Sequence, residues 1–164
     1  MNQAEYTGAG SINNLKDILE KINPRNIFLV TGKNSYRTSG AERILGEILK
    51  DKTVTLFNDV TGDPLIENII KGMDIFIESD CDAVIAVGGG SVIDTAKSIN
   101  ILSSQDADPR SVIKSKQKII NKGKQFIAIP TTSGAGSEAT HFAVVYMNKE
   151  KFSLAHEFIL PDYS

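Results

Sequence analysis

The sequence has too few cysteines for a disulfide, no long apolar run and almost no net charge. Its one cysteine, Cys81, cannot form an internal disulfide, which is typical of a cytoplasmic protein. No apolar run reaches the ~18 residues that a membrane-spanning helix needs. The N-terminus, MNQAEYTGAG, lacks the basic-then-apolar pattern of a signal peptide. A net charge of −2 gives no broad attraction to nucleic acid or anionic membranes. The sequence therefore predicts a cytoplasmic protein with neither nucleic acid nor a membrane as its partner.

Composition and length indicate one soluble globular domain. The 164 residues are 41% hydrophobic and 23% charged, which is enough apolar material for a sizeable core. The C-terminal stretch AHEFILPDYS ends on an apolar run and a proline turn rather than on a polar tail. We therefore expect residues 1–164 to be one domain, a fragment of a longer protein.

Short apolar runs alternate with helical patterns along the chain. Strongly apolar runs predict strands that are covered on both faces, and apolar residues three and four apart predict helices. Asp63 and Pro64 are residue types suited to a helix N-cap and to the first helical position. The polar segment 103–124 is expected to hold a loop and a short helix. The expected strands are 26–31, 53–60, 82–90, 125–130 and 141–147, and the expected helices are 11–22, 39–51, 63–79 and 91–102.

This alternation predicts an α/β fold, Rossmann-like, with an open, mainly parallel sheet and helices on both faces. In such a sheet, ligands bind beyond the carboxyl ends of the strands. The stretch AVGGGSVIDTAKS, residues 86–98, lies at such an end.

The glycines of this stretch predict an anion site. A helix N-terminus presents unpaired N–H groups, and Gly89 and Gly90 carry no Cβ that would hold a phosphate away from them. Ser91 offers a hydroxyl or a helix cap. Asp94, in the first turn, could stabilise the helix or hold a ribose hydroxyl or an ordered water. The alternative is a tight turn without a ligand, for which one glycine would serve.

A second glycine-rich corner follows the next strand. The stretch AIPTTSGAGSEATHF, residues 128–142, combines hydroxyl side chains with glycines. Two such loops at the same edge of the sheet could grip one ligand. The alternative is a flexible polar loop.

Together the two corners resemble the iron-containing (group III) alcohol dehydrogenase family. Its signatures have the forms G-G-G-S-x-x-D-x-A-K and P-T-T-x-G-x-G-S-E, and this chain has GGGSVIDTAK and PTTSGAGSE. The resemblance covers only the family's N-terminal, nucleotide-binding half. It implies an NAD- or NADP-linked alcohol dehydrogenase or aldehyde reductase that acts on a small alcohol or aldehyde. A divalent metal, Fe or Zn, would be held by the helical C-terminal half, so the metal ligands are not in this chain. We name no catalytic residue and expect the chain alone to be inactive.

The resemblance also assigns cofactor contacts. Lys151 matches a family lysine that reaches the cofactor, although a solvated strand lysine is the alternative. The remaining contacts are Gly89, Gly90 and Ser91 for the pyrophosphate, and Thr131, Thr132 and Thr140 for the nicotinamide side and ribose.

The chain departs from the family pattern at three positions. Gly32 lies where many NAD-using members have an aspartate that holds the adenosine ribose. Since a carboxylate would repel a 2′-phosphate, Gly32, Lys33 and Ser35 slightly favour NADP over NAD. Asp63 replaces an asparagine that lies near the cofactor in the family, and Ala135 replaces a threonine. The last two changes put individual cofactor contacts in doubt.

Other assignments stay open. Glycerol dehydrogenases, glycerol-1-phosphate dehydrogenases and dehydroquinate synthases share a similar nucleotide corner, although the PTTSGAGSE loop favours the alcohol dehydrogenase branch. A standalone nucleotide-binding module is a third reading, and a homodimer is left open. His141 and His156 have no partner at metal-ligand spacing, so we expect both to be ordinary structural or surface residues.

Overall fold

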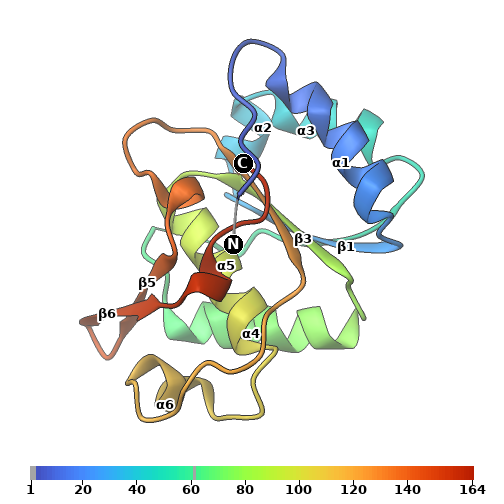
Figure 1. Ribbon diagram of the computed structural model, residues 1–164. Helices are drawn as coiled ribbons and strands as arrows, with labels where there is room; N and C mark the ends of the chain where they lie inside the picture. The colour runs from blue at the N-terminus through green and yellow to red at the C-terminus, as the bar shows by residue number, and fades with distance from the viewer. Residues whose placement is uncertain (1–2, 61) are drawn as a thin grey trace.

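The structure is a computed structural model that describes residues 3–60 and 62–164. Four strands form its main sheet: β1 (Asn26–Thr31), β2 (Thr53–Phe57), β3 (Ala83–Gly88) and β4 (Gln125–Pro130). Their order is β2-β1-β3-β4 and every neighbouring pair is parallel (Figure 1). The central strands β1 and β3 are almost entirely buried, as their unbroken apolar sequences predict.

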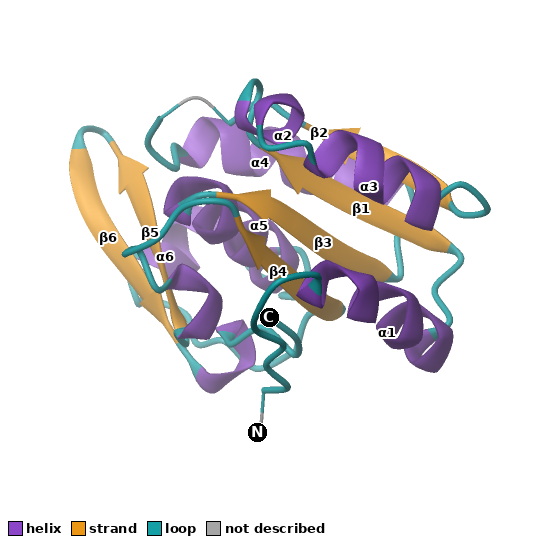
Figure 2. Cartoon of the chain, turned by 90° about the horizontal axis from the view of Figure 1, so that it is seen from above, coloured by secondary structure: helices purple, strands orange, loops and turns teal. Residues whose placement is uncertain are grey.

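Helices cover both faces of this sheet. The helices α1 (Asn14–Ile22) and α3 (Ala41–Ile48), with the short α2 (Ser35–Thr38), lie on one face, and α4 (Ile66–Glu78) and α5 (Gly90–Leu102) lie on the other (Figure 2). Alternate strand residues enter two separate cores: Phe28 packs on the side of α4 and α5, and Leu29 on the side of α1 and α3. The predicted fold class is confirmed.

The chain after β4 forms a separate hairpin. Strands β5 (Phe142–Met147) and β6 (Glu150–Ala155) are antiparallel and form a two-stranded sheet of their own. The sequence predicted β5 but not β6. A short helix, α6 (Pro109–Ile113), lies in the polar segment where one was expected. Three single 3-10 turns complete the elements: η1 (Ser11–Asn13), η2 (Ser137–Ala139) and η3 (Glu157–Ile159).

The start of α4 differs from its prediction. Asp63 is not the N-cap, because the helix begins only at Ile66 and Leu65 precedes it in an extended conformation. The cause is a tertiary contact: the carbonyl of Pro64 accepts a hydrogen bond from the N–H of Tyr146 on β5, at 2.8 Å. Leu65 forms a parallel bridge with the same tyrosine. This pairing holds the backbone out of the helix that the local sequence favours.

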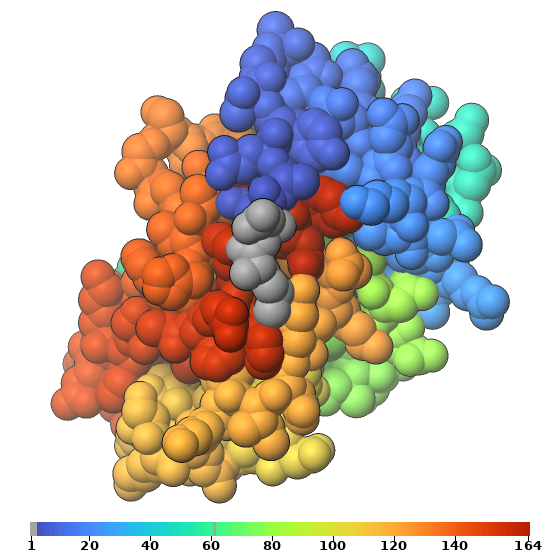
Figure 3. Space-filling model, in the orientation of Figure 1, coloured from blue at the N-terminus to red at the C-terminus, as the bar shows by residue number. Residues whose placement is uncertain are grey.

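The two ends of the chain meet beside β4. Tyr163 bridges both Ala4 and Ile127, and the N–H of Tyr6 donates to the carbonyl of Ser164 at 2.7 Å. Figure 3 shows the blue N-terminal segment next to the red C-terminal residues. Within the described residues, no helix is both long and apolar enough to cross a membrane.

Candidate functional site

A cavity of about 540 Å³ lies beyond the carboxyl ends of β1 and β3. The chain leaves β1 toward the face of α3 and leaves β3 toward the face of α5, so this is the point where an open α/β sheet binds ligands. The cavity brings together six of the predicted site residues from three separate parts of the sequence. Its lining is Gly32, Lys33, Asn34, Ser35, Val60, Gly62, Gly89, Gly90, Ser91, Val92 and Thr132.

The second loop packs directly against the glycine corner. A Cβ placed on Gly89 would lie 3.1 Å from Oγ1 of Thr132, and one on Gly90 would lie 3.0 Å from Cβ of Ala135. A Cβ on Gly88 would likewise lie only 2.6 Å from Cγ2 of Val92 on α5. None of the three has a positive φ, so they are needed for close approach rather than for an unusual backbone. Packing within the protein thus requires all three glycines rather than one, and the alternative of a tight turn without a ligand stays open.

The helix end in this cavity is open to an anion. No side chain caps α5, and the N–H groups of Val92 and Ile93 both donate to the carbonyl of Gly89. The N–H groups of Gly90 and Ser91 therefore lie at the free end of the helix, where its dipole favours negative charge. Gly90 and Ser91 line the cavity, so an anion in it can reach these groups.

One buried hydroxyl of the second loop, Oγ1 of Thr131, has no hydrogen-bond partner among the described residues. Since buried polar atoms are normally hydrogen-bonded, an orphaned hydroxyl beside the sheet edge suits a ligand. The free N–H groups of Gly90 and Ser91, with this hydroxyl nearby in the second loop, are donors that suit the phosphates and hydroxyls of a dinucleotide.

Asp94 and Thr140 face the protein. The carboxylate of Asp94 accepts from the hydroxyl of Ser137 and, at 3.0 Å, from the N–H of Val144. The hydroxyl of Thr140 lies 3.2 Å from Nζ of Lys97. Both residues tie the second loop to α5, and their predicted contacts with the cofactor stay predictions.

Lys97 is a central residue that the sequence analysis missed. Only 1% of it is exposed, and its Nζ donates to the carbonyls of Ser137, Thr140 and Phe142 at 2.5, 2.6 and 3.0 Å. Two sequence signals marked Lys97 without giving it a role: it is the last residue of the signature GGGSVIDTAK, and it lies one turn after Asp94 on α5.

Comparison with known proteins decides the family. The sequence profile described as iron-containing alcohol dehydrogenase matches residues 3–164. The chain belongs to the iron-containing alcohol dehydrogenase family.

Relatives of this chain within the iron-containing alcohol dehydrogenase family are named as dehydrogenases of alcohols. It is 36% identical to the long-chain primary alcohol dehydrogenase AdhA of Thermoanaerobacter ethanolicus, over 97% of this chain and 42% of that protein. It is also 36% identical to an NADPH-dependent butanol dehydrogenase of Clostridium saccharobutylicum, over 96% of this chain and 41% of that protein. The chain thus spans about two fifths of these relatives' length. Their names favour the alcohol dehydrogenase branch over the glycerol dehydrogenase and dehydroquinate synthase branches.

A solved structure supports the fold. The crystal structure of an NADH-dependent butanol dehydrogenase A from Thermotoga maritima superposes with a TM-score of 0.92 at 22% identity, covering 99% of this chain and 42% of that one. At this identity the likeness concerns the fold alone.

The charge of Lys97 predicts how the stability of this chain varies with pH. Burial lowers the pKa of Lys97 from 10.5 to about 8, against the opposing attraction of Asp94 and Glu138. Below pH 8 the lysine is protonated in both the folded and the unfolded chain. Between about 8 and 10.5 the folded chain releases this proton while the unfolded chain keeps it, so the contribution of Lys97 to stability rises with pH.

This prediction is tested with Lys97→Met. Urea unfolding of wild type and variant is measured at one pH below 8 and at one between 8 and 10.5. We expect the difference in the free energy of unfolding to shift toward the wild type at the higher pH. Parallel pH profiles would show that Lys97 does not titrate in this range.

Asp63 and Lys151, like Asp94, Thr131 and Thr140, are predicted site residues that are not among the described residues lining the cavity of about 540 Å³. Asp63 lines a separate hollow of about 460 Å³, together with Tyr146 and Lys149 of the β5–β6 hairpin. Lys151, exposed on β6, is paired in register with Tyr146. Asp63 and Lys151 therefore belong to one surface region, and their predicted contacts with the cofactor remain untested.

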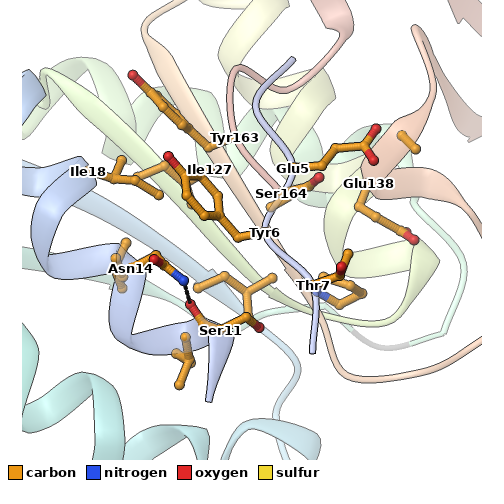
Figure 4. Close-up of a pocket in the computed structure, with 16 residues that line it drawn as sticks. Glu5, Tyr6, Thr7, Ser11, Asn14, Ile18, Ile127, Glu138, Tyr163 and Ser164 are labelled. Atoms are coloured by element: carbon orange, nitrogen blue, oxygen red, sulfur yellow. Dashed lines mark hydrogen bonds between the residues drawn. The ribbon is translucent and has the colours of Figure 1, made fainter. Parts of the chain in front are cut away.

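A further cavity, of about 270 Å³, lies beside β4 and contains none of the predicted site residues (Figure 4). Tyr6, Ile18, Ile127 and Tyr163 give it an apolar wall, and Glu5 and Glu138 lie at its opposite side. Residues of both chain ends line it, which explains why sequence patterns within single elements did not reveal it.

No group of three His, Cys, Asp or Glu side chains suited to a metal is found within residues 3–60 and 62–164. His156 has a structural role, since its Nδ1 accepts from the N–H of Phe158 at 3.2 Å. The ring of His141 packs edge-on against Phe142.

Proposed function

We propose that this chain binds a nicotinamide dinucleotide across its two glycine-rich corners, as the cofactor-binding part of a cytoplasmic, metal-dependent alcohol dehydrogenase or aldehyde reductase. The observation that carries the proposal is the cavity of about 540 Å³, where Gly32, Gly89 and Thr132 meet from three parts of the sequence. Membership of the iron-containing alcohol dehydrogenase family supports it.

In this proposal, different residues of the two corners hold different parts of the dinucleotide. The N–H groups of Gly90 and Ser91 hold the pyrophosphate at the end of α5. The loop from Thr131 to Thr140 holds the nicotinamide half, and the orphaned hydroxyl of Thr131 supplies one bond. The region of Gly32 and Ser35 holds the adenosine ribose.

NADP is the cofactor that we favour. Lys33 and Ser35 line the cavity beside Gly32, and none of the lining residues that the structure describes carries a carboxylate. An ammonium and a hydroxyl can both donate to a 2′-phosphate, whereas a carboxylate there would repel it.

A bound nicotinamide would accept a hydride from an alcohol in its oxidised form, or donate one to an aldehyde in its reduced form. This chain's part is to fix the position of the dinucleotide and to keep water from it. The iron or zinc that would polarise the substrate oxygen is held, in this proposal, by residues outside the chain.

Titration of the chain with NADPH, NADH and ADP tests the proposal. We expect saturable binding of all three, because each can place phosphate at the end of α5. NADPH should bind most tightly, because it reaches both corners, unlike ADP, and places a 2′-phosphate beside Lys33 and Ser35, unlike NADH. Binding can be followed by calorimetry. If none of the three ligands binds, the proposed function is contradicted. Tighter binding of NADH than of NADPH would contradict only the cofactor preference.

A further inference from the structure

Much of the second glycine-rich loop is exposed and is not held in place by packing within the loop itself. Residues 132–135 are exposed, and Gly134 and Gly136 adopt positive φ. The loop is instead held from outside by α5, since Lys97 and Asp94 both reach into it. Lys97 and Asp94 lie one helical turn apart on α5, and each holds part of the loop in place.

Lys97 has as many hydrogen-bond donors as there are loop carbonyls that accept from it. An ammonium group has three N–H donors, and the carbonyls of Ser137, Thr140 and Phe142 take all three. The side chain is 1% exposed, so nothing remains with which it could contact a ligand in the cavity. A charged group buried at this cost indicates that the backbone of 137–142 must be held in one particular arrangement.

The geometry points to Lys97 as a positioning residue, which fixes the second loop for the nicotinamide half of the cofactor. The inference rests on the proposed function, because Thr140 lies in the anchored segment and Thr131 and Thr132 precede it in the same loop. The first corner, Gly32 with Gly89 and Gly90 at the start of α5, has no hydrogen bond to Lys97 within the described part of the chain. Loss of the anchor should therefore affect one half of the ligand and spare the other.

The test compares NADPH with adenosine 2′,5′-bisphosphate in the variant Lys97→Met. Methionine fills a similar volume but donates no hydrogen bond. We expect the Kd of NADPH to rise by about tenfold or more, the effect of losing a charged anchor. The Kd of the bisphosphate, which needs only the first corner, should stay unchanged. A purely structural lysine would lower the melting temperature without moving the ratio of the two constants.

Two further variants complete the design. Lys114→Met removes an exposed lysine of the polar segment and should change neither constant. Ser137→Ala removes only the hydroxyl bond to Asp94 and keeps the carbonyl that Lys97 uses. It should shift the ratio in the same direction by a smaller factor, and it decides the question if Lys97→Met does not fold.

The outcomes separate this inference from the proposed function. Equal weakening of both ligands, or of neither, in a folded Lys97→Met chain would overturn the positioning role and leave the proposed function standing. A wild-type chain that binds neither ligand would overturn both. Selective weakening of NADPH supports the inference.

Discussion

Replacement of Gly90 by valine should weaken the binding of NADPH by at least about a hundredfold, which is the loss of one or two charge-assisted hydrogen bonds. A Cβ on Gly90 already lies 3.0 Å from Cβ of Ala135, so two further methyl groups must push the second loop outward. The same methyl groups lie at the open end of α5, where the pyrophosphate would be held. Calorimetric titration measures the effect.

The control for this variant is Gly46→Val. Gly46 is also helical, on α3, and no atom lies within 4 Å of a Cβ placed there. Both substitutions introduce the same β-branched residue into a helix, at the first residue of α5 for Gly90 and in the interior of α3 for Gly46, so a general effect of valine on folding appears in the control as well. Circular dichroism should show that both variants fold. Unchanged binding of NADPH by a folded Gly90→Val chain would mean that the dinucleotide does not lie at this corner.

The glycine corner could be predicted from sequence because its signal is local. An apolar strand, three glycines and a helical pattern follow one another without a break, and the chain itself brings them together. The meeting of this corner with the loop of Thr132 was also predictable, since parallel strands end at one edge of a sheet. The close contact of that loop with Gly89 and Gly90 depends on side-chain packing and could not be predicted.

Features that depend on partners distant in sequence were missed. The partners of Lys97 lie more than forty residues on, at Thr140 and Phe142, and a lysine in a helix usually lies in solvent. The late start of α4 has the same origin, because the chain before it pairs with Tyr146. Local propensity favoured a helix from Asp63 onward, and a tertiary hydrogen bond overrode it.

Gly32→Asp should reverse the cofactor preference. A carboxylate at this position would lie beside the proposed 2′-phosphate site, and like charges in contact weaken NADPH binding by about a hundredfold, or about 3 kcal/mol. NADH lacks this phosphate, and its two ribose hydroxyls can both donate to the carboxylate. We therefore expect NADH to bind as tightly as before or more tightly. The ratio of the two Kd values is the measurement.

The structure shows which control the experiment needs. A Cβ on Gly32 would collide with the hydroxyl of Ser35, although the side chain of Ser35 can rotate and the backbone of Gly32 lies outside the left-handed region. Gly32→Asn has the size of the aspartate without its charge and causes the same collision. If charge sets the preference, asparagine weakens both cofactors alike, whereas aspartate acts selectively against NADPH. If aspartate and asparagine have the same effect on the ratio, steric crowding explains the change, and the absence of a carboxylate at Gly32 does not favour NADP.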